Sequence, residues 1–311
     1  MKNIAYAVVA MAALTACDGV GGGDSGPGGP GGPTDPGTPP PVNDVPAQIA
    51  GDLKAGTFNP ADGGTMIVRI TLDADVLDAV YTRNSDYDVP GYLAFTTQDD
   101  PLDRFFTAFG RESSDGSVQA VLAADGGQFT KYFGGATYRQ TSAYTAPSGG
   151  LASYAGDYVG TLNVGTREGT LPSTAPAELR PLRSFRVSGQ VFLNADFTDG
   201  SVNGAVYNRR LMDDADGPLG TPTPIETIFL IPAAVATNGS FSGVVENIAQ
   251  DSLGSYAGIF GGTNASSVAG GIRLEGDFLT DFTNEEEYGI FVLDRCGTTP
   301  TICLEVDQLG E

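Results

Sequence analysis

Apolar and polar residues alternate with a period of two along most of the chain after residue 46. The segments 65–72 and 185–197 show this most clearly, with Met66, Val68 and Ile70 in the apolar set of the first. Because successive side chains of a strand point to opposite faces of a sheet, the period predicts strands with one buried and one solvated face. The same alternation recurs at 241–245, 272–274 and 288–292. No stretch predicts a long amphipathic helix, so the pattern favours an all-β, antiparallel fold.

Turn-forming residues separate these segments. A Gly that follows Asp or Asn between two apolar runs is typical of a hairpin turn. A further cluster, Pro147-Ser148-Gly149-Gly150, predicts a boundary between a β-rich domain at 47–150 and a second domain at 151–311. The length of the second domain suits an eight-stranded antiparallel β-barrel. The turn signals are Asp62-Gly63-Gly64, Asp115-Gly116, Asp125-Gly126-Gly127, Asp199-Gly200, Asn203-Gly204 and Asn238-Gly239.

The first 16 residues read as an export signal. Lys2 gives a positive start, and the thirteen mostly apolar residues that end at Ala16 are too few to cross a bilayer as a helix. The run Leu14-Thr15-Ala16-Cys17 resembles a bacterial lipobox, in which the Cys thiol receives a diacylglyceryl group and the cleaved chain is then acylated, commonly with palmitate. An ordinary signal peptide with an incidental Cys17 is the alternative. Asp18 follows, a residue that retains some enteric lipoproteins in the inner membrane.

A Gly- and Pro-rich segment comes next. Of the 29 residues from Asp18 to Pro46, ten are Gly and eight are Pro, so the segment lacks apolar area to bury. We therefore expect residues 17–46 to form a disordered tether that carries the lipid at Cys17 and holds the remaining chain away from the membrane.

Charge and composition exclude several classes of function. The formal net charge of -22 opposes nucleic-acid binding, which needs a basic surface. The chain has no His, so His-dependent triads are excluded, and its three Cys are too few for a Cys-rich zinc site. We expect no enzyme activity, no cofactor and no metal.

One stretch, 254–271, is more specific than alternation alone. An aromatic residue and Gly (Phe260, Gly261) precede a small loop with Ala265, and Ala269 and Gly270 open the next strand. This resembles the barrel motif of transferrin-binding protein B and related surface lipoproteins. The segments 154–160, 196–204 and 241–243 also match, and the resemblance covers about residues 154–293, roughly half the chain.

The resemblance implies a single lobe in which 47–150 is the handle domain and 151–311 the barrel. It further implies an outer-membrane lipoprotein, exposed at the cell surface, that binds a ligand, with a link to iron or haem acquisition. Single-lobed relatives bind various ligands, including haem-carrying proteins and complement regulators, so transferrin itself is not implied. The chain departs from the family at Ser266 and Ser267, where the family often carries acidic residues.

Cys296 and Cys303 lie close together in the sequence of a chain with an export signal. This predicts a disulfide that closes a terminal hairpin. Free thiols and a metal site are the alternatives, and the metal site lacks further soft ligands.

Other candidate groups are open to two interpretations. The acidic runs Glu285-Glu286-Glu287, Asp213-Asp214 and Asp99-Asp100 fit calcium ligands or glycosidase carboxylates, but we expect a solvated surface. Arg209 and Arg210 are weak candidates to clamp a carboxylate or phosphate, and otherwise balance Asp213 and Asp214. Phe105-Phe106 and Tyr132-Phe133 are interface anchors or, as we favour, core residues.

These features predict a monomeric, membrane-anchored binding module for an unknown protein or small-molecule ligand. A structural or assembly component of the cell envelope with no soluble ligand is the main alternative. A hydrolase acting on polysaccharide is a third.

Overall fold

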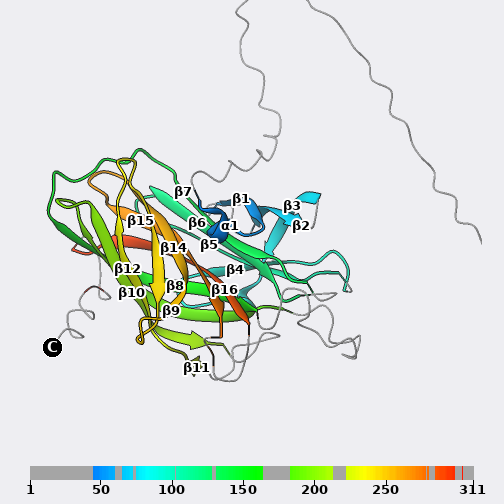
Figure 1. Ribbon diagram of the computed structural model, residues 1–311. Helices are drawn as coiled ribbons and strands as arrows, with labels where there is room; N and C mark the ends of the chain where they lie inside the picture. The colour runs from blue at the N-terminus through cyan, green and yellow to red at the C-terminus, as the bar shows by residue number, and fades with distance from the viewer. Residues whose placement is uncertain are drawn as a thin grey trace, which may run out of the picture. The chain divides into compact units, whose positions relative to one another are not determined.

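The computed structural model describes residues 45–59, 65–72, 75–101, 103–127, 131–163, 183–212, 222–277, 279, 284–297 and 303. The fold is almost entirely β, as predicted (Figure 1). The helices in this part of the chain are the single turn α1 (Ala47–Ala50) and the 3-10 turn η2 (Ser85–Tyr87). None of the described helices is long and apolar enough to cross a membrane. The predicted signal peptide, Cys17 and the tether up to residue 44 lie outside the described residues, whereas Val45 already packs against the core.

The first sheet has seven antiparallel strands in sequence order. It curls so that β1 meets the last strands: the N–H of Asp52 donates to the carbonyl of Gly134 (2.9 Å), and the side-chain amide of Gln119 bonds to the backbone of Phe58. Apolar residues on one side of these strands, such as Met66, form a core of their own. The strands are β1 (Leu53–Phe58), β2 (Thr65–Leu72), β3 (Asp75–Arg83), β4 (Leu93–Thr97), β5 (Phe106–Glu112), β6 (Val118–Asp125) and β7 (Gly134–Gln140).

The second sheet closes into the predicted eight-stranded barrel. Each strand pairs antiparallel with its neighbours, and pairing of β9 with β10 completes the ring. The short strand β11 (Thr223–Pro224) adds to one edge of β10. The barrel strands are β8 (Leu151–Asn163), β9 (Phe185–Asp196), β10 (Ser201–Leu211), β12 (Ile228–Ala234), β13 (Ser240–Glu246), β14 (Ser252–Gly261), β15 (Ser267–Gly276) and β16 (Glu285–Arg295).

The turn signals match the strand connections in most places. Gly116, Gly200 and Gly239 adopt positive φ angles at hairpin turns. The prediction of a turn at Asn203-Gly204 is wrong, because both residues lie inside β10. A Cβ on Gly204 would stand 2.1 Å from the carbonyl oxygen of Phe192, so this glycine permits close approach of β9. The register shift beside it lies in the pairing of β10 with β12. Asp62-Gly63-Gly64 lies outside the described residues.

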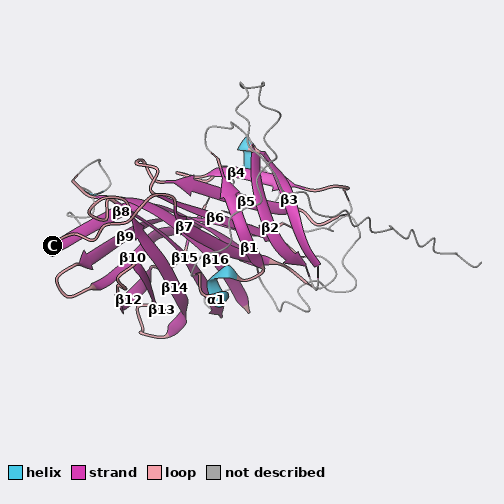
Figure 2. Cartoon of the chain, turned by 90° about the horizontal axis from the view of Figure 1, so that it is seen from above, coloured by secondary structure: helices cyan, strands magenta, loops and turns pink. Residues whose placement is uncertain are grey.

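The two sheets share a core, and their described residues belong to one compact unit. Side chains of α1 and β5–β7 pack against the outer face of β14–β16, where Ile49, Tyr92 and Tyr138 contact a set that includes Ile290 and Val292. Figure 2 shows β6 and β7 beside these barrel strands. The strand β16 is therefore covered on both faces, and its burial is continuous instead of alternating.

This double cover overturns the expectation that Glu285-Glu286-Glu287 is a solvated run. The three side chains are buried, at 1%, 5% and 0% exposure. All three lie on β16, whose two faces are both covered. Buried carboxylates require hydrogen-bond or ion-pair partners. Glu286 accepts from Arg273 (3.0 Å) and from the hydroxyl of Tyr288 (2.9 Å), while Glu287 faces the barrel interior.

Candidate functional site

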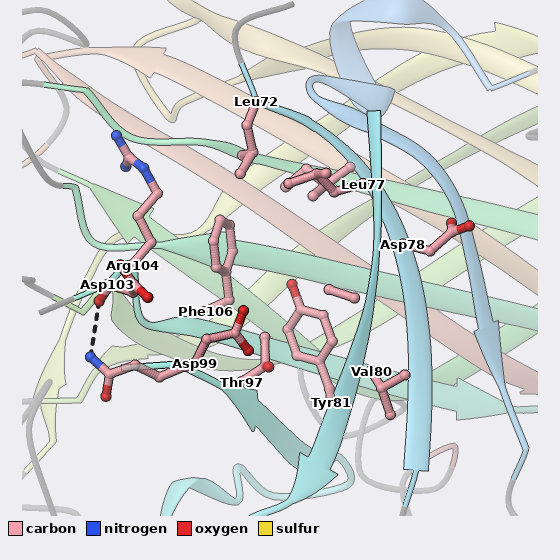
Figure 3. A pocket seen from close by; sticks show the side chains of 13 residues that line it. Leu72, Leu77, Asp78, Val80, Tyr81, Thr97, Asp99, Asp103, Arg104 and Phe106 are labelled. Atoms are coloured by element: carbon pink, nitrogen blue, oxygen red, sulfur yellow. Dashed lines mark hydrogen bonds between the residues drawn. The ribbon is translucent and has the colours of Figure 1, made fainter. Parts of the chain in front are cut away.

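A groove opens in the first sheet where β3 separates from β4. The strand β3 pairs with β2 along its whole length, from Asp75 to Thr82, but pairs with β4 only at Thr82 and Arg83. The space left between β3 and the β4–β5 side has a volume of ≈ 670 Å³ (Figure 3). Typical ligand sites occupy about 300–1,000 Å³. The groove is lined by Ile70, Leu72, Leu77, Asp78, Ala79, Val80, Tyr81, Thr97, Gln98, Asp99, Asp103, Arg104 and Phe106.

Tyr81 and Phe106 form the floor of this groove. Their rings meet edge to face across the unpaired gap, with 6.4 Å between centroids. The Tyr81 side chain is fully buried, and its hydroxyl has no hydrogen-bond partner among the described residues. Burial, and secondarily the charge of Asp125, raises the pKa of this hydroxyl far above its usual value, so it stays neutral and can donate.

An unsatisfied buried hydroxyl costs about 1–3 kcal/mol. A ligand acceptor would recover part of that cost once the side chains that cover the hydroxyl move aside, because the hydroxyl itself has no exposed surface. A smaller hollow on the barrel, of ≈ 300 Å³ and lined by residues including Phe229 and Ile248, has no such buried unpartnered atom in its described lining.

The rim of the groove is acidic. The side-chain amide of Gln98 donates to the backbone carbonyl of Asp103 at 2.9 Å (Figure 3). Asp99 and Asp103 both line the groove and are exposed at its opening. Neither carboxylate has a side-chain partner among the described residues. Asp78 differs, because Arg69 contacts both of its oxygens at 2.7 and 2.8 Å, and these hydrogen bonds lower the pKa of Asp78.

Arg104 is the positively charged residue in the groove lining, and its charge is already paired within the protein. It forms an ion pair with Asp125 and lies 4.6 Å over the ring of Phe133. Asp125 is almost completely buried, and burial raises its pKa to about 6 despite the opposing charge of Arg104. The groove therefore combines apolar walls, the Tyr81 hydroxyl as a donor without an acceptor among the described residues, and the carboxylates of Asp99 and Asp103 at its opening.

The motif residues predicted from the sequence lie elsewhere, in the barrel core and in the core that the two sheets share. Phe260 is fully buried, with its ring 5.2–5.3 Å from those of Tyr154, Phe197 and Phe241. The hydroxyl of Tyr154 donates to the carbonyl of Ala265 at 2.6 Å. These contacts assign a structural role to the motif.

The two glycines of the motif permit close packing. A Cβ on Gly270 would lie 2.3 Å from the ring of Phe291, and one on Gly261 would lie 2.4 Å from Val118 in the first sheet. Ala269, on β15, is buried in the core that the two sheets share.

Ser266 and Ser267 connect this motif to the first sheet. Their hydroxyls donate to Asp115, which lies at the turn between β5 and β6, and Ser267 is 3.1 Å from it. The hydroxyl of Ser113 also donates to Asp115, at 2.7 Å. The serines therefore bind a carboxylate from another part of the chain.

Arg209 and Arg210 do not converge on a common site. Arg209 is 1% exposed inside the barrel and forms an ion pair with Glu287 at 2.6 Å, whereas Arg210 is exposed. A second N–H of Arg209 donates to the carbonyl of Glu226 (2.9 Å), and the hydroxyl of Tyr158 donates to Glu287 (2.6 Å). The two side chains therefore do not form the clamp that the sequence offered as a weak candidate. Asp213 and Asp214, which the favoured interpretation pairs with them, lie outside the described residues.

The disulfide between Cys296 and Cys303 is confirmed, with 5.6 Å between the Cα atoms. Phe105-Phe106 and Tyr132-Phe133 are buried, as favoured from the sequence. The described residues contain no group of three carboxylate or thiol side chains placed to hold a metal ion. The groove was not predicted from the sequence. Its one signal in the sequence is the run from Asp75 to Tyr81, where polar and apolar residues alternate only weakly.

Comparison with known proteins gives structural matches only. No family model matches the chain, and no curated protein sequence matches it. The chain is similar to a transferrin-binding protein B double mutant from Haemophilus parasuis Hp5 (12% identity, TM-score 0.37, 78% of this chain and 54% of that one). It is also similar to intact Ap-TbpB with N and C lobes (12% identity, TM-score 0.38, 74% and 52%).

A third match is the isotype 1 transferrin-binding protein B from serogroup B Neisseria meningitidis (16% identity, TM-score 0.34, 73% of this chain and 39% of that one). The chain spans about half, or less, of the length of these structures. These three solved structures are all transferrin-binding proteins B.

Proposed function

We propose that this chain is a lipid-anchored lipoprotein of the bacterial envelope that binds a protein or small-molecule ligand in the groove between β3 and β4–β5. The observation that carries the proposal is the fully buried Tyr81 hydroxyl, which has no partner among the described residues. A buried hydroxyl without a partner costs stability, and a role in ligand binding would offset that cost. The groove has no arrangement of acid and base that would suit catalysis, so we propose no enzyme activity.

The anchor is proposed from the sequence. Lipid on Cys17 would hold the chain to the outer membrane, and the tether would let the folded part reach beyond the surface. Cell-surface exposure, a monomeric state and a link to iron or haem acquisition follow from the motif resemblance. Asp18 leaves inner-membrane retention as the competing location.

Two experiments test the anchor. Cys17→Ala should move the protein from the membrane fraction to the soluble fraction, and continued membrane association would refute lipidation. Protease added to intact cells should digest the protein, and complete protection would refute surface exposure.

The groove is tested by capture with matched variants of the full chain. Leu77 (47% exposed, in the groove) and Val244 (44% exposed, on β13) are equivalent surface positions in strands. A ligand captured from host fluids or medium should be lost with Leu77→Asp and retained with Val244→Asp. Capture of envelope components alone would favour the alternative role in envelope assembly.

Tyr81→Phe separates a binding role from a structural one. Removing an unsatisfied hydroxyl should leave the free energy of unfolding unchanged or raise it by about 1 kcal/mol, while ligand binding weakens. If Tyr81→Phe lowers stability and leaves ligand affinity intact, the hydroxyl has a structural role and the proposed site is wrong.

A further inference from the structure

We propose that the ligand of the groove is an extended segment of a partner protein, apolar at alternate positions and carrying Lys or Arg, which adds as a strand to the free edge of β3. This inference rests on the proposed function above and names the class of partner. About seven residues of such a segment would span Asp75 to Tyr81, since both strands have the same rise of ~3.3 Å per residue.

The first support is the unpaired backbone of β3. On one side the strand pairs with β2 from Asp75 to Thr82, and on the other only Thr82 and Arg83 pair with β4. Among the described residues, no strand therefore pairs with that edge from Asp75 to Tyr81. Backbone N–H and C=O groups of every second residue face this edge, and an extended peptide satisfies them by strand addition.

The second support is the side chains that β3 exposes. Val76, Leu77 and Val80 are 56%, 47% and 56% exposed. Edges that must stay unpaired are usually protected by charged side chains, Pro or a bulge. From Asp75 to Tyr81 there is no Lys, Pro or bulge, and of the two Asp in this run, Asp78 is already paired with Arg69. Apolar residues on both faces of this edge suit contact with alternate side chains of an added strand.

The buried Tyr81 hydroxyl is the third support. It lies on the groove side of β3 and lacks an acceptor among the described residues. A peptide backbone supplies a carbonyl at every residue, so an added strand brings acceptors to the groove floor whatever its side chains are.

Charge selects among the candidate occupants. Asp75 at the start of β3, and Asp99 and Asp103 across the groove, have no cationic partner among the described residues, which favours a segment with Lys or Arg. A second copy of this chain would bring another net charge of -22. The tether from Asp18 to Pro46 contains no Lys or Arg, and its eight Pro have no N–H to donate.

The test is a random library of eight-residue peptides selected on the full-length chain. We expect enrichment of peptides that alternate β-branched residues and contain Lys or Arg. Saturation with the best peptide should slow amide hydrogen exchange in residues 75–83 at least tenfold. Methylation of its alternate backbone nitrogens should weaken binding at least tenfold.

Matched variants test the charge requirement. Val80→Lys should weaken binding of the selected peptide about tenfold more than Val80→Glu does, because both remove the apolar contact and only Lys repels a cationic segment. Val244→Lys should not weaken it. Val80 and Val244 are both exposed strand valines, so a general loss of folding would affect all three variants.

The outcomes separate this inference from the proposed function. If no selected peptide depends on residue 80, or if exchange in 75–83 is unchanged at saturation, strand addition is wrong. Loss of a captured ligand with Leu77→Asp would in that case still support the groove as a binding site. If Leu77→Asp also has no effect on capture, both proposals are overturned.

Discussion

The guanidinium of Arg209 and the carboxylate of Glu287 form an ion pair inside the barrel, 2.6 Å apart, with side chains 1% and 0% exposed. Removal of one partner leaves the other charge buried without compensation, which costs about 3–5 kcal/mol. We therefore expect Arg209→Met to lower the free energy of unfolding by that amount, measured by urea denaturation.

The neighbouring arginine provides the control. Arg210 is exposed, so Arg210→Met should change stability by no more than about 0.5 kcal/mol. The double variant Arg209→Met with Glu287→Gln should recover part of the loss, because it removes the stranded charge. Equal stability of Arg209→Met and the parent chain would contradict this account.

Asp125 should make the protein less stable as pH rises through mildly acidic values. Burial raises its pKa from 3.8 in the unfolded chain to about 6, against the opposing charge of Arg104. The folded state then binds the proton more tightly, so stability is fully present below about pH 4 and falls by about 3 kcal/mol as pH rises past about 6.

Asp125→Asn removes this titration. The difference in free energy of unfolding between this variant and the parent should shift in favour of the variant by about 3 kcal/mol between about pH 4 and about pH 7. Parallel stability curves over that range would show that the carboxylate is not perturbed in the folded state.

Asp115 should have the opposite pH dependence. Its partial burial acts to raise the pKa, but hydrogen bonds from Ser266, Ser113 and Ser117 outweigh burial and lower it. A depressed pKa gives stability that is present above the unfolded pKa of 3.8 and is lost as pH falls further. Asp115→Ala should therefore be destabilising by about 1–2 kcal/mol near neutral pH, and less so in acid.

A double-mutant cycle with Ser266→Ala checks that the effect comes from this contact. The two changes should cost less together than the sum of each alone, since both break the same hydrogen bond. Strict additivity would mean that the hydrogen bond between Ser266 and Asp115 contributes nothing to stability.

The disulfide closes a short loop, with seven residues of sequence separation between Cys296 and Cys303. By loop entropy, its removal should cost about 2–3 kcal/mol. Thermal unfolding of the Cys296→Ser and Cys303→Ser double variant should show this loss. Reductant should produce the same loss in the parent chain and none in the variant.

Local patterns in the sequence predict the strands and most turns of this fold. Alternation of Met66, Val68 and Ile70 places the buried face of β2 correctly, and Gly116, Gly200 and Gly239 mark hairpins. These successes share a cause: each depends on residues within one strand or one turn, where period and backbone conformation are local properties.

The failures depend on contacts that are distant in the sequence. The run at 285–287 looks solvated because a strand of a barrel normally has one wet face, and only the first sheet makes its outer face dry. Arg209 looks exposed beside Arg210 until Glu287, 78 residues away, is placed against it. The groove arises from pairs that β3 and β4 do not make. The weak alternation from Asp75 to Tyr81 does not by itself predict that a strand partner is missing.

Because the two sheets share a core, the first sheet cannot bury its outer apolar face until the last strands of the barrel have been synthesised. The hydroxyl of Tyr92 donates to the carbonyl of Ile290 and accepts from the N–H of Val292, which lies 200 positions later. Loops of that length close slowly, and at ~5–20 residues per second a ribosome needs on the order of 10–40 s to make the intervening chain. During that interval the apolar face of β5–β7 has no cover, so we expect nascent chains to depend on a holding chaperone until β16 emerges.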